Sequence, residues 1–198
     1  LKDAPIKEPE SSHIVPNEQF PRQAQVLLED SVPGVYVSVG TERGFMSVAM
    51  AEQATHLLLV DYDAAVARYN RINTALLELA SNREEYLNLR LKATHASWDK
   101  LIKKNPSLSV EAKAYLNNPD NWKWWNQKVR KEARFKDFHR DTRLGGREFQ
   151  GVNYLFEDAP FEKLSRMAKE GKIQSIVGNL GDENFTKQIA ESIKKAGL

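Results

Sequence analysis

The sequence of 198 residues contains no cysteine, only four histidines and no long hydrophobic run. Without cysteine the chain has no disulfide framework, thiolate nucleophile or cysteine-ligated metal, although this absence does not identify a compartment. The hydrophobic stretches are strand-sized and fall far below the roughly 20 residues that cross a bilayer, so no membrane span is predicted. The histidines are too scattered to predict a metal site.

Several catalytic motifs are also missing. No Gly-Lys-Ser or Gly-Lys-Thr completes a P-loop, and no Gly-x-Ser-x-Gly marks a hydrolase nucleophile. The triplet His139-Arg140-Asp141 is similar to part of a kinase catalytic loop, but Gly146 occupies the position of the metal-binding asparagine. The sequence therefore predicts neither a kinase nor a P-loop enzyme.

Charge is distributed unevenly along the chain. The formal net charge is only +2, yet residues 90–147 contain 15 Lys or Arg and six Asp or Glu, so the rest of the chain is net negative. With 41% hydrophobic and 28% charged residues, the composition is that of a globular protein. The length is sufficient for one substantial domain.

The first 17 residues are rich in Pro, Glu, Ser and Lys and lack apolar periodicity, which predicts a flexible N-terminal arm. The sequence begins with Leu1 rather than Met, as expected either of a trimmed polypeptide or of an exported protein whose leader has been removed. Residues 18–30 have the apolar pattern of a short helix, which leads into a Val-Pro-Gly turn at 32–34.

A strand, a glycine turn and a helix follow this turn. The alternating valines of 35–39 predict a strand that stops at Gly40, and a helix is expected from Phe45. A second apolar run at 57–60 ends in Asp61, which lies 21 residues beyond Gly40. In such βαβ units a phosphate or ribose lies against the helix N-terminus and a carboxylate holds the ribose hydroxyls.

The remaining chain predicts further helices and few strands. Apolar residues at steps of four and three predict a helix over 64–79, and Ser81 with Glu84 has the spacing of a capping box for a helix that ends near Leu91. Residues 81–145 are interpreted as a helical insertion that ends at Gly145-Gly146. Beyond it we expect a short strand or connector at 151–156, a helix at 161–169, a strand at 173–177 and an amphipathic helix at 184–196.

These elements predict an α/β fold with a Rossmann-like, mainly parallel sheet flanked by helices and a large helical insertion after the second strand. One domain is expected over 18–198. At most four strands are predicted, whereas doubly wound sheets usually have about five or more. Either the polypeptide continues beyond Leu198, so that C-terminal strands are lacking here, or the sheet is small.

The glycine turn resembles that of class I S-adenosylmethionine-dependent methyltransferases. In that fold the first strand ends in an acidic residue, any residue, and then glycines at three alternate positions. Gly40 and Gly44 match the first and third glycines, while Glu42 replaces the second and Ser38 replaces the acid. From about residue 15, including Val-Pro-Asn-Glu-Gln-Phe and Gly-Val-Tyr-Val-Ser-Val-Gly, the chain resembles an uncharacterised bacterial family with a methyltransferase-like domain. This resemblance implies a Rossmann-like fold and S-adenosylmethionine as cofactor.

Nine residues are candidate cofactor ligands: Gly40, Thr41, Glu42, Gly44, Asp61, Asp63, Gly178, Asn179 and Asp182. A carboxylate at Glu42 would repel a pyrophosphate, which disfavours NAD, but it could pair with a cationic group of S-adenosylmethionine. The alternative is a solvated loop residue.

Asp61 is expected either to bind a ribose or to cap the helix at 64, and Asp63 is the second candidate for both roles. Gly178, Asn179 and Asp182 would lie at the same sheet edge, unless they form an ordinary turn. No catalytic base and no metal ligand are predicted.

The basic segment 90–147 interleaves aromatic residues with cations, a combination that binds nucleic acid through stacking and phosphate contacts. Trp122 and Trp125 share a helical face, however, which favours the alternative of core aromatics beneath a solvated basic face. Nucleic acid is therefore the less favoured partner. No feature of the sequence specifies an oligomeric state.

Three functions follow from these features. The first is a methyltransferase-like protein that binds S-adenosylmethionine and transfers its methyl group to an unknown acceptor, in the cytoplasm if it is active. The second is a non-enzymatic binding or effector protein that retains the fold, which export would favour. The third is a nucleic-acid-modifying enzyme, which requires the basic face to adjoin the turn at Gly40.

Overall fold

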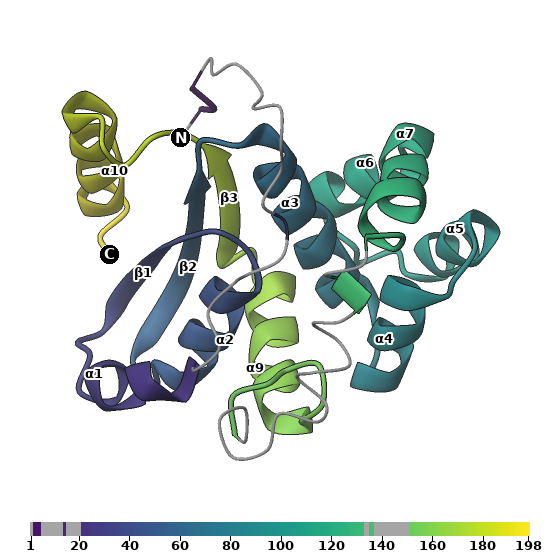
Figure 1. Cartoon of the computed structure of the whole chain (residues 1–198), viewed down its shortest axis with the longest axis horizontal. Helices are drawn as coiled ribbons and strands as arrows, with labels where there is room; N and C mark the ends of the chain where they lie inside the picture. The colour runs from purple at the N-terminus through teal and green to yellow at the C-terminus, as the bar shows by residue number, and fades with distance from the viewer. Residues whose placement is uncertain (1, 5–13, 15–20, 133–134, 137–150) are drawn as a thin grey trace.

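A computed structural model gives the fold of residues 2–4, 14, 21–132, 135–136 and 151–198. Three parallel strands form one open sheet in the order β1-β2-β3 (Figure 1). They are β1 (Gly34–Val39), β2 (Ala54–Asp61) and β3 (Ile173–Val177). The predicted α/β class and parallel sheet are confirmed.

The strand register brings the carboxyl ends of all three strands to one edge of the sheet. Val39 lies opposite Val60, and Asp61 lies opposite Val177. The residues that follow each strand, Gly40 and Gly178 among them, therefore lie along this edge, and Figure 1 shows β2 and β3 running upward side by side to it. This is the edge at which ligands of open parallel sheets collect.

Helices cover both faces of the sheet because alternate residues of β2 point to opposite sides. Leu57 and Leu59 join the large core beneath the helices α2 (Glu42–Met50), α3 (Ala64–Leu79) and α9 (Asp158–Lys169). On the other face, Leu58 and Val60 pack with α10 (Glu183–Lys195). The predicted bounds of α3 and β3 agree with the structure.

The described part of the predicted insertion consists of short helices joined by turns. It contains α4 (Arg83–Leu91), α5 (His95–Lys104), α6 (Val110–Asn117), α7 (Pro119–Trp124) and a π-helical turn, η2 (Trp125–Val129). These helices lie beside α3 in Figure 1, and α6 packs directly against it. The predicted exit at 145–146 lies outside the described residues.

Several local predictions need correction. Asn82, not Ser81, caps α4, and Glu85 accepts a hydrogen bond from the Ser81 amide, so the capping box is shifted by one residue. Residues 151–156 form turns, not a strand. The helix α2 begins at Glu42, ahead of the predicted start at Phe45.

The N-terminal region is described in part. The helix predicted over 18–30 is split into a 3₁₀ turn, η1 (Pro21–Ala24), and α1 (Gln25–Glu29), with 18–20 outside the described residues. Most of the predicted flexible arm also lies outside them. In its described part, the Ala4 amide donates to the Val177 carbonyl at 2.8 Å. Within the residues described here, no helix combines the length and hydrophobicity that crossing a membrane requires.

Candidate functional site

The structure brings Gly40, Asp61 and Asp63 together at the carboxyl edge. Gly40 has φ of 86°, a left-handed conformation that favours glycine. Its amide donates to Asp61 Oδ2 at 3.1 Å, and the Asp63 amide donates to Asp61 Oδ1 at 2.9 Å. The Asp61 carboxylate therefore joins the end of β2 to the turn after β1.

Asp63, rather than Asp61, caps the helix that follows β2. Its Oδ1 accepts from the Ala65 amide at 2.8 Å, so the predicted capping role belongs to the second aspartate. Asn70, in the second turn of α3, donates from Nδ2 to the Gly40 carbonyl at 2.9 Å. Asp63 Oδ2 and Asn70 Oδ1 are both buried without a hydrogen-bond partner in the described part of the chain.

Glu42 faces the interior and is only 1% exposed. Its carboxylate accepts hydrogen bonds from Tyr69 and Tyr154 and forms an ion pair with Arg90, which is fully buried. Asn73 extends this network to Tyr86, whose hydroxyl donates to Asn73 Oδ1 at 2.7 Å. The partners of the Glu42 carboxylate are thus protein groups. Glu42 is therefore not a solvated loop residue, and in this structure its carboxylate is not accessible to a cationic group of a cofactor.

Electrostatics keep this buried network ionised. Burial alone would raise the pKa of Glu42, but the Arg90 charge and the hydroxyl hydrogen bonds outweigh it and lower the pKa below its ordinary value. The Glu42 charge in turn raises the pKa of Arg90. Burial raises the pKa of Tyr86 to about 12, so this hydroxyl remains a donor at neutral pH.

The neighbouring candidates Thr41 and Gly44 make packing contacts. Thr41 Oγ1 donates to the Ile14 carbonyl at 2.6 Å, which ties the N-terminal region to the turn. A Cβ at Gly44 would lie 2.4 Å from Leu59 Cδ2 and 3.2 Å from Ser38 Cβ. Gly44 is therefore required for the close approach of α2 to the sheet, whether or not a ligand binds.

The candidates after β3 form a turn and a helix cap. Asp182 Oδ1 accepts from the Asn184 and Phe185 amides and so caps α10, while Asn179 accepts from the Gly181 amide at 2.9 Å. A Cβ at Gly178 would lie 2.0 Å from the Phe185 ring. These contacts agree with the turn that was the alternative for this segment.

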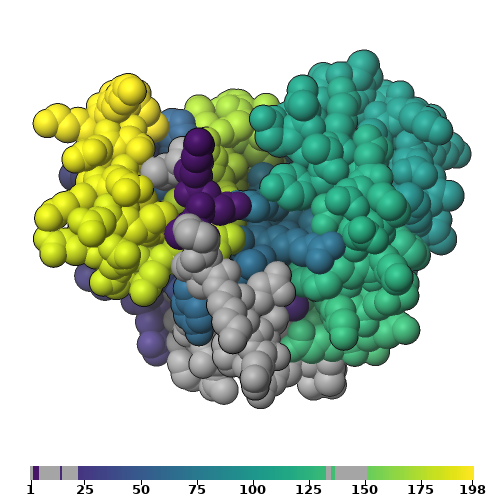
Figure 2. All heavy atoms as spheres, turned by 90° about the horizontal axis from the view of Figure 1, so that it is seen from above, coloured from purple at the N-terminus to yellow at the C-terminus, as the bar shows by residue number. Residues whose placement is uncertain are grey.

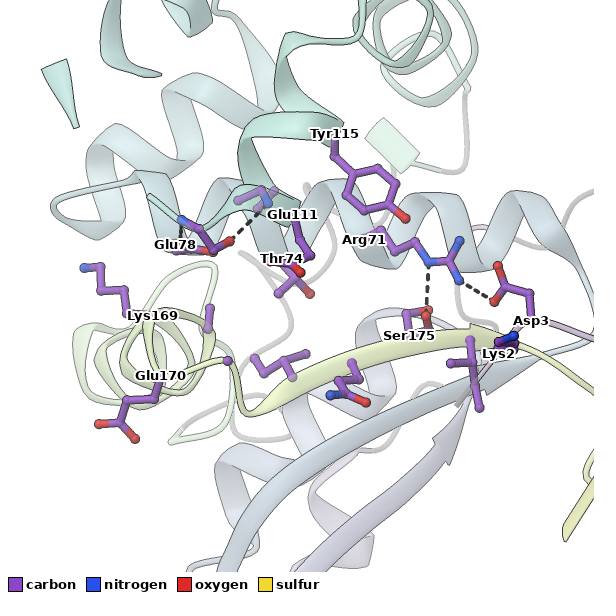
Figure 3. Close-up of a pocket in the computed structure, with 18 residues that line it drawn as sticks. Lys2, Asp3, Arg71, Thr74, Glu78, Glu111, Tyr115, Lys169, Glu170 and Ser175 are labelled. Atoms are coloured by element: carbon purple, nitrogen blue, oxygen red, sulfur yellow. Dashed lines mark hydrogen bonds and ion pairs between the residues drawn. The ribbon is translucent and has the colours of Figure 1, made fainter. Parts of the chain in front are cut away.

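Neither of two clefts found in the described part of the molecule is lined by Gly40 or Asp61. The larger, of about 870 Å³, lies between β3, α3 and α6. Figure 3 shows Arg71 reaching across it to the Ser175 carbonyl and to Asp3. None of the nine candidate residues lines this larger cleft.

The smaller cleft, of about 470 Å³, lies within the basic segment. It is lined by Ile14, Trp124, Gln127, Lys128, Lys131 and Glu132. Trp125 and Phe135 are buried core residues, as the core alternative predicted, whereas Trp122 and Trp124 are only partly buried. No cluster of metal-ligating side chains occurs among the residues that the structure describes.

Sequence reasoning missed the partners of Glu42. Arg90 lies 48 positions away and Tyr154 lies 112 away, and no local pattern connects such distant residues. Tyr69 was expected only as part of an apolar helical face. Two signals in the sequence were available: Glu42 is a single acid at the start of a buried helix, and Arg90 is a single arginine on an otherwise apolar helical face.

A family described as a domain of unknown function (DUF7790) matches residues 13–198. The chain belongs to this DUF7790 family. No curated protein matches it. The family match includes the glycine turn, the three strands and the helical insertion, so all nine candidate residues lie within the DUF7790 domain.

Proposed function

We propose that this DUF7790 domain is a methyltransferase-like protein that binds S-adenosylmethionine at the carboxyl edge of a Rossmann-like sheet. The observation that supports the proposal is the pairing of Gly40 with Asp61. The left-handed turn after β1 and the carboxylate at the end of β2 lie within hydrogen-bond distance of each other, at the sheet edge where such folds bind the ribose and phosphates of a nucleotide.

Asp61 is the proposed ribose ligand, because a carboxylate can accept hydrogen bonds from both vicinal hydroxyls. The amides of Gly40 and Asp63 hold this carboxylate at the sheet edge. The side chain is 8% exposed, so a ribose would approach it over the sheet edge. The unpartnered oxygens of Asp63 and Asn70 lie beside the same turn and supply further acceptors for a ligand's donors after a local side-chain shift.

Methyl transfer needs little covalent participation from the protein. When bound, S-adenosylmethionine would supply an activated methyl group: its methyl–sulfur bond would break as the bond to the acceptor forms, leaving S-adenosylhomocysteine, and a protic acceptor would release its proton to solvent. Gly40 and Asp61 would hold the nucleoside in position, and no residue at this edge is assigned as a base.

The second candidate is a non-enzymatic binding or effector protein that retains the fold without methyl transfer. The inward position of Glu42 favours it, because the residue at the second glycine position contributes to the core. The absence of Gly40 and Asp61 from the linings of the two described clefts favours it too.

A calorimetric titration distinguishes the two candidates. S-adenosylmethionine and S-adenosylhomocysteine are titrated into the wild type, Asp61→Asn and the matched control Asp182→Asn, which changes an aspartate after β3 that caps a helix. We expect saturable binding that weakens about tenfold or more in Asp61→Asn, equivalent to about 1.4 kcal/mol, and changes less than about twofold in Asp182→Asn. Circular dichroism confirms that each variant is folded.

No binding by the folded wild type would overturn the first candidate and support the second. Equal losses of affinity in the two variants would mean that the substitutions act through the stability of the fold and not through contact with the ligand. That result would also count against Asp61 as the binding site.

A further inference from the structure

We propose that the smaller cleft, defined by Ile14, Trp124, Gln127, Lys128, Lys131 and Glu132, binds single-stranded nucleic acid, which serves as the methyl acceptor. The binding surface stands on its own observations. Its role as acceptor site rests on the proposed function.

The position of the cleft links it to the glycine turn. Ile14 lines the cleft, and its carbonyl accepts a hydrogen bond from Thr41, the residue that follows Gly40. The basic segment therefore adjoins the turn, which is the arrangement that the nucleic-acid hypothesis requires. Seen from above in Figure 2, the helical insertion lies on one side of the carboxyl edge and α10 on the other.

The insertion is fixed in this position by Arg68 of α3. Arg68 Nε donates to Asn121 Oδ1 at 2.8 Å, and Nη2 donates to the Asp120 carbonyl at 2.9 Å. Both acceptors belong to α7, which leads directly into the lining residue Trp124. Because α3 starts at the capping residue Asp63, one helix connects the sheet edge with the wall of the cleft.

The charge of the cleft suits a polyanion. Lys128 and Lys131 are exposed and lie three residues apart, and neither ammonium has a hydrogen-bond or ion-pair partner within the described ranges. Glu132 contributes one carboxylate to the lining. By contrast, Arg130 is bound by the carbonyls of Leu89 and Ala93, so it supports the fold and is not offered to a ligand.

Trp124 supplies a surface for base stacking. Trp124 is partly exposed and lines the cleft. The Arg68 guanidinium lies over one face of its ring, 4.9 Å from the centroid, so a base would stack on the other face. Stacking of a base on such a ring is worth about 1–3 kcal/mol, and adjacent cations hold the backbone phosphates. Trp98 and Trp125 are fully buried, so they are not available for this contact.

The local backbone also departs from ordinary helix at this point. Gln127 and Lys128 belong to the π-helical turn η2, and π-turns inside helices are frequent at functional sites. This irregularity therefore lies in the wall of the cleft.

Single-stranded nucleic acid fits these features better than a duplex or an acidic protein. The bases of a duplex are already stacked on each other, whereas unpaired bases can stack on an aromatic side chain. An acidic peptide would use the lysines but would gain little from Trp124.

The test is fluorescence anisotropy with a labelled oligouridylate of about 12 nucleotides. The cleft variant Lys128→Glu/Lys131→Glu is compared with the control Lys103→Glu/Lys104→Glu, which makes the same charge change at exposed positions of α5. We expect about a tenfold or greater loss of affinity in the cleft variant and a change of less than about threefold in the control. Trp124→Leu is expected to weaken binding several-fold while leaving the salt dependence unchanged.

Four outcomes would overturn the inference: no binding by the wild type, equal losses in the two charge variants, no effect of Trp124→Leu, or equal displacement of the oligonucleotide by polyglutamate. The last would indicate an acidic protein partner. S-adenosylhomocysteine binding is measured on the same variants. If the oligonucleotide binds and S-adenosylhomocysteine does not, the nucleic-acid site is supported and its role as methyl acceptor is rejected, so the two proposals fail separately.

Discussion

Two carboxylates flank the glycine turn, and they have opposite surroundings. Asp61 lies at the carboxyl edge and accepts hydrogen bonds from the amides of Gly40 and Asp63. Glu42 begins α2 and lies in the interior, where it pairs with the buried Arg90. The sequence assigned both to one candidate ligand site, but in the structure only Asp61 lies at the edge, and Glu42 faces the core.

The difference shows how a buried charge is stabilised. An ionised carboxylate in the core requires a counter-charge and hydrogen bonds to offset its lost hydration, and Arg90 with two tyrosine hydroxyls supplies them. At the edge, the Asp61 carboxylate accepts from the backbone amides of Gly40 and Asp63. Glu42 thus joins the turn, the helical insertion and the segment containing Tyr154, whereas Asp61 joins the end of β2 to the turn after β1.

The largest effect is expected from breaking the buried pair. Glu42→Gln leaves the Arg90 charge buried without its counter-charge, and Arg90→Met leaves the Glu42 charge in the same position. Each substitution should lower the free energy of unfolding by about 3–5 kcal/mol. The measurement is the midpoint of urea unfolding, followed by circular dichroism.

The double variant Glu42→Gln/Arg90→Met is the control for that comparison. Because it removes both charges, it should be destabilised by much less than the sum of the single variants. Additive losses would mean that the two side chains do not act as a pair.

Acid should weaken the same interaction more gradually. The pKa of Glu42 in the folded chain is lowered from its ordinary 4.5 by Arg90 and the tyrosine hydroxyls, against the opposing effect of burial. Its contribution to stability is therefore complete above about pH 4.5 and is lost as the pH falls through the lower folded value. Urea unfolding from about pH 6 to about pH 3 should show a smaller loss of stability in Glu42→Gln than in the wild type. Parallel curves would contradict this assignment.

Local sequence signals were sufficient for most of the secondary structure. The four-and-three spacing of α3 reflects which side chains that helix buries, and the structure agrees. The alternating valines predicted the strand β1, although its side chains are only partly buried and Val39 is exposed. The capping box at α4 was displaced by one residue because Asn82 is an equally good cap.

The candidate site was predictable only in part. Gly40 and Asp61 follow adjacent parallel strands, so their proximity could be inferred from the βαβ order. The pairing of Glu42 with Arg90 depends on how the insertion folds back onto α2 and α3, and no periodicity within the chain encodes that contact. The cleft beside Trp124 likewise depends on the position of Ile14.

A smaller effect is expected at Gly44, on the interior side of the turn. Gly44→Ala places a methyl group 2.4 Å from Leu59 Cδ2, and Leu59 is fully buried. Overpacking of this kind costs about 1–3 kcal/mol. Gly171→Ala is a useful contrast, because its Cβ meets nothing within 4 Å although φ is 68°. In thermal unfolding, the loss of stability in Gly171→Ala should reflect backbone strain alone. Unchanged stability of Gly44→Ala would mean that α2 can move away from the sheet.

The smallest effect separates the two helix caps at the carboxyl edge. Asp63→Ala and Asp182→Ala each remove a cap and should cost about 1 kcal/mol, within a range of about 0.5–2, measured by urea unfolding. Only Asp63 lies beside Gly40 and Asp61, where its second oxygen is buried without a partner in the described chain. Binding of a ligand to the folded state raises the free energy of unfolding by mass action. S-adenosylhomocysteine should therefore stabilise the Asp182→Ala protein as much as it stabilises the wild type. It should stabilise the Asp63→Ala protein less. Equal ligand-induced shifts in the two variants would show that Asp63 is only a cap, and would confine the ligand-binding role to Asp61.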